Sequence, residues 1–158
     1  MKALLLAPER DRFLLQRRRK PGDPYDGFWE LPGGRVHRGE SIHHCLMREV
    51  AEETGLHVQE VLGQRGEQAS DRLGGGVRVL SPLVTVEVTA PGPIFGQYYA
   101  CQARGTARDT AEGNAHRWIT PAEFRATYLD VPISELSTVD LLAMRLILDD
   151  GLLAGIVR

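Results

Sequence analysis

The segment from Ser41 to Thr54 constrains the fold of this chain more than any other, because it predicts one helix with clear ends. Ser41 can cap the amino end of the helix, and Gly55 is a natural stop one residue past its last turn. Apolar residues recur at positions 46, 47, 50 and 51, so one side of the helix can pack on a core. A core must therefore lie beside a helix whose other side is strongly charged.

That charged side carries three glutamates, Glu49, Glu52 and Glu53, at relative positions i, i+3 and i+4. With about 3.6 residues per turn, all three share one face of the helix. Each like-charged pair costs roughly a few tenths of a kcal/mol at the surface. Water and nearby cations such as Arg48 can offset this repulsion, and so can a hard divalent cation, since Mg²⁺ prefers oxygen ligands. The three residues alone leave both interpretations open.

The rest of the chain predicts strands before and after this helix and a second long helix at the end. Two glycine-rich or proline-rich stretches, near residues 70–76 and 91–93, predict a loop or hairpin tip and a turn. The expected strands are 3–7, 13–15, 57–68, 77–80, 83–88, 97–103 and 117–119, with a short helix from Pro121 and a last helix at about 137–148. This order predicts an α/β sandwich rather than a regular βαβ series.

Length and composition limit the classes of protein. The chain has 158 residues, 42% of them hydrophobic, which predicts one domain over 1–158 with a real core. A net charge of −2 argues against a general nucleic-acid binder, but not against a small anionic ligand. The apolar run near the amino end is too short for a signal peptide or a membrane span, which predicts a cytoplasmic protein without a membrane partner. Cys45 and Cys101 fit neither a disulfide framework nor a zinc spacing.

The residues around the helix form a longer pattern. A glycine pair, Gly33-Gly34, follows a strand-like segment, so its backbone can approach a ligand closely. Glu40 can reach back to Arg48 and fix it. The spacing is Gly34, five residues, Glu40, seven residues, and then Arg-Glu-Val-Ala-Glu-Glu-Thr-Gly-Leu over 48–56. This pattern resembles the signature of the Nudix hydrolases, and every fixed position of the signature matches.

The resemblance implies a fold, a metal and a set of ligands. The family fold is an α/β/α sandwich with a mixed β-sheet. By resemblance, Glu49, Glu52 and Glu53 bind Mg²⁺ or Mn²⁺, and the backbone carbonyl of Gly33 adds a ligand. The resemblance also implies that Arg48, paired with Glu40, orients the glutamates.

Family members often use one more acidic residue, from a loop in the second half of the chain, as a metal ligand or as the general base. Glu112 lies six residues before Trp118, as in the MutT-type enzymes, and is the candidate, with Asp109 as the fallback. Either Glu53 or Glu112 takes the proton of the attacking water. Attack on phosphorus would give a nucleoside monophosphate and a phosphorylated remainder.

Substrate contacts are expected from three further positions, Arg18, Gly34 and Trp29. Arg18 belongs to the basic run 17–20 and aligns with a substrate-contacting arginine of MutT-type enzymes. Aromatic residues such as Trp29 can stack on a base, although aromatic residues in strands more often belong to the core. His43 and His44 point about 100° apart on a helix, so the sequence does not predict a histidine metal site.

The resemblance implies hydrolysis of a phosphoanhydride bond in a nucleoside diphosphate linked to a group X. A nucleoside triphosphate is the leading candidate substrate. The alternatives are an ADP-ribose or sugar-nucleotide hydrolase, and a domain that binds a nucleotide without cutting it. An oxidised-guanine specificity would want an asparagine near Ile133-Ser134, and its absence argues against that role. Homodimers are common in the family, and the sequence leaves the oligomeric state open.

Overall fold

The computed structural model describes residues 1–70, 72, 75–89 and 93–154, and a seven-stranded sheet forms its centre. The strand order is β3-β2-β1-β8-β4, with β7 also on β8 and β9 also on β2. β1 and β8 run parallel and the other pairs run antiparallel, so the sheet is mixed. The strands are β1 Lys2–Leu6, β2 Phe13–Arg18, β3 Trp29–Glu30, β4 His57–Val61, β7 Val84–Val88, β8 Ile94–Arg104 and β9 Gly113–Ile119.

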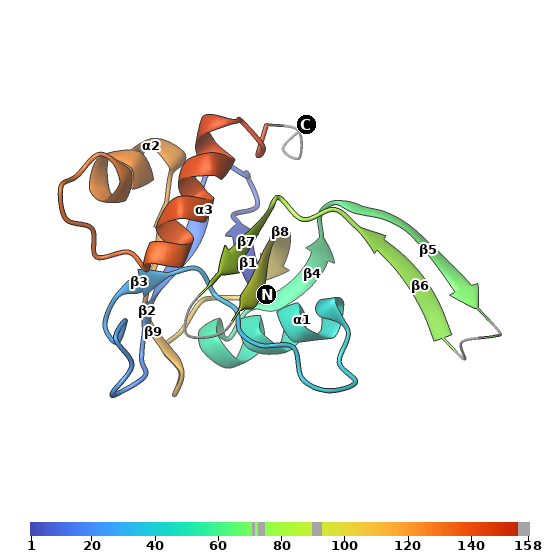
Figure 1. Cartoon of the computed structure of the whole chain (residues 1–158). Helices are drawn as coiled ribbons and strands as arrows, with labels where there is room; N and C mark the ends of the chain where they lie inside the picture. The colour runs from blue at the N-terminus through green and yellow to red at the C-terminus, as the bar shows by residue number, and fades with distance from the viewer. Residues whose placement is uncertain (71, 73–74, 90–92, 155–158) are drawn as a thin grey trace.

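Helices cover both faces of this sheet (Figure 1). α1 (Ile42–Thr54) lies on one face, while α2 (Pro121–Phe124), the π-helix η1 (Arg125–Leu129) and α3 (Thr138–Asp149) lie on the other. The strand β1 shows why both layers exist. Leu4 and Leu6 belong to the apolar cluster under α3, whereas Ala3 and Leu5 belong to the cluster under α1. Alternate residues of a strand face opposite sides, so this uninterrupted apolar run is what a doubly covered strand requires.

The helix ends follow the predicted capping. The Ser41 side chain accepts a hydrogen bond from the His44 N–H, and Gly55 takes the left-handed conformation with φ of 71°. The last helix also lies within one residue of its predicted bounds. Pro121 begins a helix whose cap, Thr120, pairs reciprocally with Glu123. Local signals thus place the described α-helices α1, α2 and α3, and the α/β/α sandwich with a mixed sheet is confirmed.

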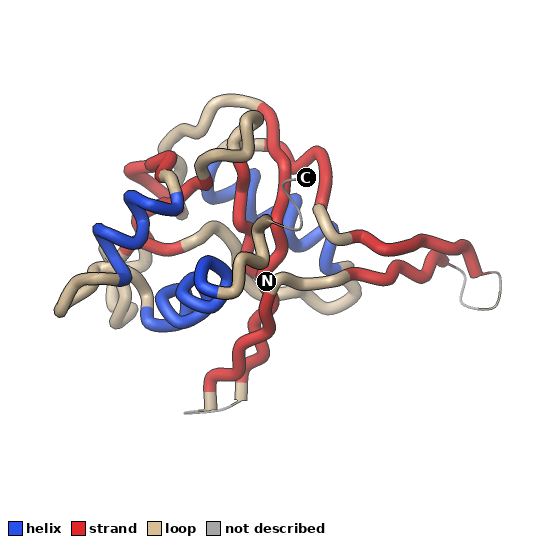
Figure 2. The backbone as a smooth tube through the Cα atoms, turned by 90° about the horizontal axis from the view of Figure 1, so that it is seen from above, coloured by secondary structure: helices blue, strands red, loops and turns tan. Residues whose placement is uncertain are grey.

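The predicted strand over 57–68 is wrong as one element, because the chain turns at Gly63. Gly63 has a φ of 88°, and a Cβ there would lie 2.7 Å from the Ser81 carbonyl oxygen. Beyond this turn, β5 (Gln64–Ser70) and β6 (Gly75–Leu80) form a two-stranded sheet of their own, and neither pairs with another strand in the described part of the chain. They project from the body as a separate two-stranded ribbon (Figures 1 and 2), which we call the β5–β6 arm.

The structure also differs from the predicted bounds at the tip of the arm, at the start of β8 and at the start of β9. The stretch 70–76 is predicted as a loop or hairpin tip, and it does join two antiparallel strands, but the strands extend into it: Ser70 ends β5 and Gly75 opens β6. Residues 71, 73 and 74 lie outside the described residues. β8 begins three residues earlier than expected. β9 begins at Gly113 instead of 117, with Ala115 at a positive φ of 50°. The turn expected at 91–93 falls mostly outside the described residues.

No helix within the described part of the chain is long and apolar enough to cross a membrane.

Candidate active site

Three carboxylates converge at the carboxyl half of α1. One oxygen from each of Glu49, Glu52 and Glu112 lies within 4.8 Å of the other two. The first two residues come from α1, and Glu112 comes from the loop that precedes β9. Glu49 is buried, whereas Glu52 and Glu112 are exposed. Three negative groups this close repel one another, and their oxygens are the donors that Mg²⁺ prefers, so the set fits a hard divalent cation.

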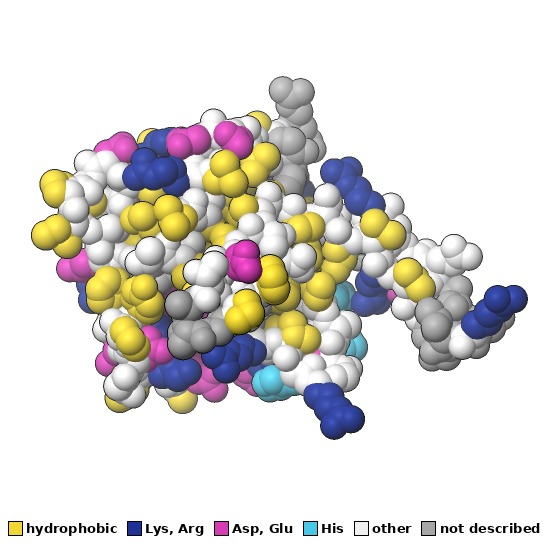
Figure 3. All heavy atoms as spheres, in the orientation of Figure 1, with side chains coloured by type: hydrophobic (Ala, Val, Ile, Leu, Met, Phe, Trp, Pro, Cys, Tyr) yellow, Lys and Arg dark blue, Asp and Glu magenta, His cyan; other side chains and the backbone are white. Residues whose placement is uncertain are grey.

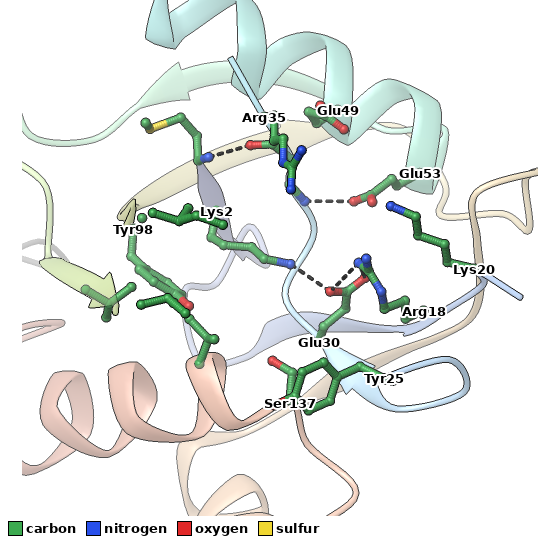
Figure 4. Close-up of a pocket in the computed structure, with 18 of the residues that line it drawn as sticks. Lys2, Arg18, Lys20, Tyr25, Glu30, Arg35, Glu49, Glu53, Tyr98 and Ser137 are labelled. Carbon is green, nitrogen blue, oxygen red and sulfur yellow. Dashed lines mark hydrogen bonds and ion pairs between the residues drawn. The ribbon is translucent and has the colours of Figure 1, made fainter. Parts of the chain in front are cut away.

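Glu53 occupies a different position from the other two helix glutamates. Its side chain is buried and accepts a hydrogen bond of 2.7 Å from the Gly33 N–H. Burial raises the pKa of Glu53 to about 7, although Lys2 and the Gly33 N–H act in the opposite direction. Figure 4 shows Glu49 and Glu53 reaching from α1 toward the same cavity. The structure therefore groups Glu112, rather than Glu53, with Glu49 and Glu52.

The two glycines before α1 allow this close packing. Gly33 has a φ of 138°, and a Cβ there would collide with the Met1 carbonyl oxygen. A Cβ at Gly34 would overlap the carboxylate of Glu49. The Gly34 carbonyl accepts a hydrogen bond of 2.5 Å from the Met1 amino group. Glycine at position 33 leaves room for the backbone of β1, and glycine at position 34 leaves room for the Glu49 carboxylate in its present position.

Arg48 ties the carboxylates together. Its guanidinium donates to both oxygens of Glu40 at 2.8 and 3.0 Å, and also to Glu49 at 2.8 Å and Glu52 at 2.9 Å. The paired hydrogen bonds from Arg48 lower the pKa of Glu40 to about 2. The predicted contact between Glu40 and Arg48 is thus present, and Arg48 brings positive charge to the edge of the acidic cluster.

A cavity of about 1070 Å³ opens beside the acidic cluster. Glu49, Glu53 and Glu112 lie on its wall, and its lining has charged and apolar parts. The cations are Lys2, Arg18, Arg19, Lys20 and Arg35, and the apolar residues of β7 and β8 are Val86, Val88, Ile94 and Phe95. A ligand with phosphates at one end and a planar or apolar group at the other suits such a lining.

Arg18 is held in place on the cavity wall. It donates to Asp23 at 2.9 Å and to Glu30 at 3.3 Å. Within the described residues, Arg19, Lys20 and Arg35 form no ion pair, which leaves their charge available to an anion. Trp29 is not among the described residues that line the cavity, and the Arg17 guanidinium lies 5.0 Å from its ring centre. A substrate contact by Trp29 stays a prediction.

Two neighbouring tyrosines of β8, Tyr98 and Tyr99, face opposite layers. Tyr98 lines the cavity, whereas Tyr99 packs with the cluster under α1. The fallback candidate, Asp109, accepts a hydrogen bond from the Ala115 N–H and lies outside the acidic cluster.

A buried polar network, which no pattern in the sequence indicates, lies under the cavity. The Asp140 carboxylate accepts hydrogen bonds from the Tyr98 hydroxyl at 2.7 Å, the Ser137 hydroxyl at 2.9 Å and the Leu31 N–H at 3.1 Å. Lys2 donates to Glu30 at 2.8 Å (Figure 4). Burial opposes the charge on Lys2, but Asp140 and Glu30 outweigh it, so the net shift of its pKa is upward. This network fixes α3 against β1 and β3.

Comparisons with known proteins agree with this fold. The family model described as NUDIX domain matches residues 2–137, which is most of the chain. The chain therefore belongs to the Nudix domain family.

Two curated relatives illustrate the range of named activities. A protein of Mycobacterium tuberculosis named "Putative 8-oxo-dGTP diphosphatase 2" is 39% identical over 97 residues, which are 61% of this chain and 57% of that protein. The "ADP-ribose pyrophosphatase" of Methanocaldococcus jannaschii is 35% identical over 74 residues, 46% of this chain and 43% of that protein. The matched parts thus span less than two thirds of either relative.

Two solved structures share the fold. The MutT Nudix hydrolase of Burkholderia pseudomallei has a TM-score of 0.64 at 19% identity, covering 92% of this chain and 94% of that one. The Nudix domain of Shewanella oneidensis NrtR, solved with ADP ribose, has a TM-score of 0.63 at 19% identity, and the match covers 95% of this chain and 85% of that one. At this identity the likeness concerns the fold alone.

Proposed function

We propose that this chain hydrolyses a phosphoanhydride bond in a nucleoside diphosphate linked to a group X, with a nucleoside triphosphate as the leading candidate. One observation carries the proposal: the carboxylates of Glu49, Glu52 and Glu112 converge at the edge of a cavity lined by five cations. The carboxylates suit a divalent cation and the cations suit phosphates, so the cavity supports both halves of a metal-polyphosphate complex.

The proposed cofactor is Mg²⁺, with Mn²⁺ as the alternative, held by Glu49, Glu52 and Glu112 and by the Gly33 carbonyl. When bound, such an ion neutralises phosphate oxygens and lowers the pKa of a coordinated water. Arg48 holds Glu49 and Glu52 in position through the hydrogen bonds described above, and Glu40 holds Arg48. Glu53 lies beside these ligands with its carboxylate held by the Gly33 N–H, and its own contact with the ion stays a prediction.

The chain's own residues supply the remaining steps. Arg18 binds the phosphates together with Arg19, Lys20 and Arg35, and Gly34 lets the substrate approach the backbone. Glu53 or Glu112 accepts a proton from the water that attacks phosphorus. The P–O bond of the anhydride then breaks, which releases a nucleoside monophosphate and a phosphorylated remainder. The apolar residues of β7 and β8 face the group at the other end of the substrate.

A second candidate is the hydrolysis of ADP-ribose or a sugar nucleotide at the same site. Two observations favour it: the relative named ADP-ribose pyrophosphatase, and the bound ADP ribose in the NrtR domain. A domain that binds a nucleotide without cutting it is a third candidate. All the glutamates of the signature are present, which favours catalysis over binding alone. A cytoplasmic location and a homodimer remain predictions from the sequence and the family.

The test is a substrate panel with Mg²⁺, in which phosphate release is measured after phosphatase coupling. The panel contains nucleoside triphosphates, ADP-ribose, dinucleoside polyphosphates and sugar nucleotides. Hydrolysis of a triphosphate to monophosphate and pyrophosphate supports the leading candidate, and preference for ADP-ribose supports the second. Absence of turnover on every compound with Mg²⁺ and with Mn²⁺ would reject an enzymatic role.

A further inference from the structure

The end of α1 is bonded to the loop that carries Glu112. The last turn of an α-helix leaves carbonyl groups without partners inside the helix. In α1, the Glu53 carbonyl accepts hydrogen bonds from the Thr110 hydroxyl at 3.2 Å and from His116 Nε2 at 3.1 Å. The Thr54 carbonyl accepts one from the Arg108 N–H at 3.0 Å. The same helix end therefore anchors the loop and bears two of the three clustered carboxylates.

The Thr110 hydroxyl stands at the centre of this contact. A hydroxyl has one proton to donate and two lone pairs to accept with. The Glu53 carbonyl at 3.2 Å is a closer acceptor for this proton than the Gly113 carbonyl at 3.4 Å. The Thr110 hydroxyl also accepts from the Glu112 N–H at 3.2 Å and from the Gly113 N–H at 3.0 Å. One oxygen atom thus joins the backbone of Glu112 to the backbone of α1.

Gly113 and His116 complete the contact. A Cβ at Gly113 would collide with the Glu53 carbonyl oxygen, so the chain passes the helix end as closely as a backbone can. The side chain of His116 is nearly buried, and its bond to the Glu53 carbonyl requires the proton on Nε2. Both residues hold the start of β9 against α1.

Glu112 itself has little else to hold it. Its side chain is exposed, and no hydrogen bond or ion pair to its carboxylate occurs among the described residues. The position of this carboxylate near Glu49 and Glu52 therefore depends on the backbone of the loop. Arg108 and His116 hold this backbone at its two ends, and Thr110 is the side chain that bonds directly to the Glu112 N–H.

We propose that Thr110, supported by His116, is a positioning residue that sets the metal affinity of the site by fixing Glu112 against the end of α1. This inference rests on the proposed function, because it assumes that the three carboxylates bind a divalent cation. Residues that orient metal ligands typically change metal affinity by about 10- to 100-fold when they are replaced.

The direct test is the binding of Mn²⁺ alone, measured from the electron paramagnetic resonance signal of the free ion. Thr110→Val keeps the shape of the side chain but removes the hydroxyl, and we expect about tenfold weaker binding. Thr110→Ser keeps the hydroxyl and should bind as the wild type does. Thermal unfolding checks that both variants are folded. If Thr110→Val does not fold, His116→Leu replaces it as the test variant.

A double-variant comparison separates positioning of Glu112 from a general effect on the fold. If Thr110 acts through Glu112, adding Thr110→Val to Glu112→Gln should weaken Mn²⁺ binding no further than Glu112→Gln does alone. Independent losses that multiply in the double variant would overturn the inference, as would wild-type affinity in folded Thr110→Val. A wild type that neither binds Mn²⁺ nor hydrolyses any compound of the panel would overturn the proposed function as well, and the inference with it.

Discussion

Two regions of this molecule are built from the same residue types but differ in how firmly their side chains are held. At the carboxylate corner, formed by Gly33, Gly34, Glu40 and α1, Arg48 donates to three glutamates. In the β5–β6 arm, Arg78 pairs with a single glutamate, Glu67, at 3.0 Å.

Surroundings explain the difference. Every described side chain of the arm outside Leu80 is exposed, and Figure 3 shows the arm projecting from one side of the body. An exposed ion pair contributes little, whereas several linked pairs fix a geometry. The same residue substitution should therefore have a large effect in one region and almost none in the other.

The largest expected effect comes from removing the metal. Treatment with EDTA should abolish hydrolysis, because the repulsion among the clustered carboxylates is then uncompensated and the phosphates lose their counter-ion. Adding back Mg²⁺ in excess should restore the rate in the substrate assay. Full activity in EDTA would show that the carboxylate corner does not act through a metal.

Glu53→Gln should keep the fold and lower kcat by about 10²- to 10⁴-fold, the range for loss of a general base or a comparable charge. Glutamine preserves the size of the side chain and can still accept from the Gly33 N–H. The matched variant in the arm, Glu67→Gln, should turn over at the wild-type rate. Steady-state kinetics with thermal unfolding measures both, and a near-normal rate for Glu53→Gln would show that another residue has this role.

Gly34→Ala should lower activity by about 10- to 100-fold, because its methyl group would occupy the space of the Glu49 carboxylate and displace a proposed ligand. The matched variant is Gly66→Ala in the arm, where a Cβ meets no atom within 4 Å. The Mg²⁺ concentration for half-maximal rate reports the displacement. An unchanged value in Gly34→Ala would mean that Glu49 does not need its present position.

Arg48→Lys should give the smallest loss, about tenfold in kcat/KM, since lysine keeps the charge but cannot donate to both oxygens of Glu40 while also reaching Glu49. Arg78→Lys in the arm should change neither kinetics nor unfolding measurably. Equal losses of kcat/KM in Arg48→Lys and Arg78→Lys would contradict the claim that side chains are held more firmly at the carboxylate corner than in the arm.

The sequence predicts the carboxylate corner well because its signals are local. Helix caps, the glutamate spacing and the glycine pair all lie within Gly33 to Leu56, so no long-range contact is needed to interpret them. Glu112 is predicted because it lies six residues before Trp118, the same spacing as in the MutT-type enzymes. The structure places it beside Glu49 and Glu52.

Features that depend on distant segments were missed. The network of Lys2, Tyr98 and Asp140 joins residues from the two ends and the middle of the chain, and each residue alone looks ordinary. The Thr110 contact was missed because an isolated threonine in a polar loop carries no signal. The turn at Gly63 was missed because residues on both sides of it have strand-like composition.

The alternation along β1 limits how this scaffold can change in evolution or in the laboratory. Ala3 and Leu5 face one layer while Leu4 and Leu6 face the other, so the strand has no tolerant side. A single-residue insertion there would exchange the two sets and move Lys2 away from Glu30. Substitutions in the loops, or in the residues of β7 and β8 that line the cavity, can therefore change specificity with less damage to the fold than changes in β1.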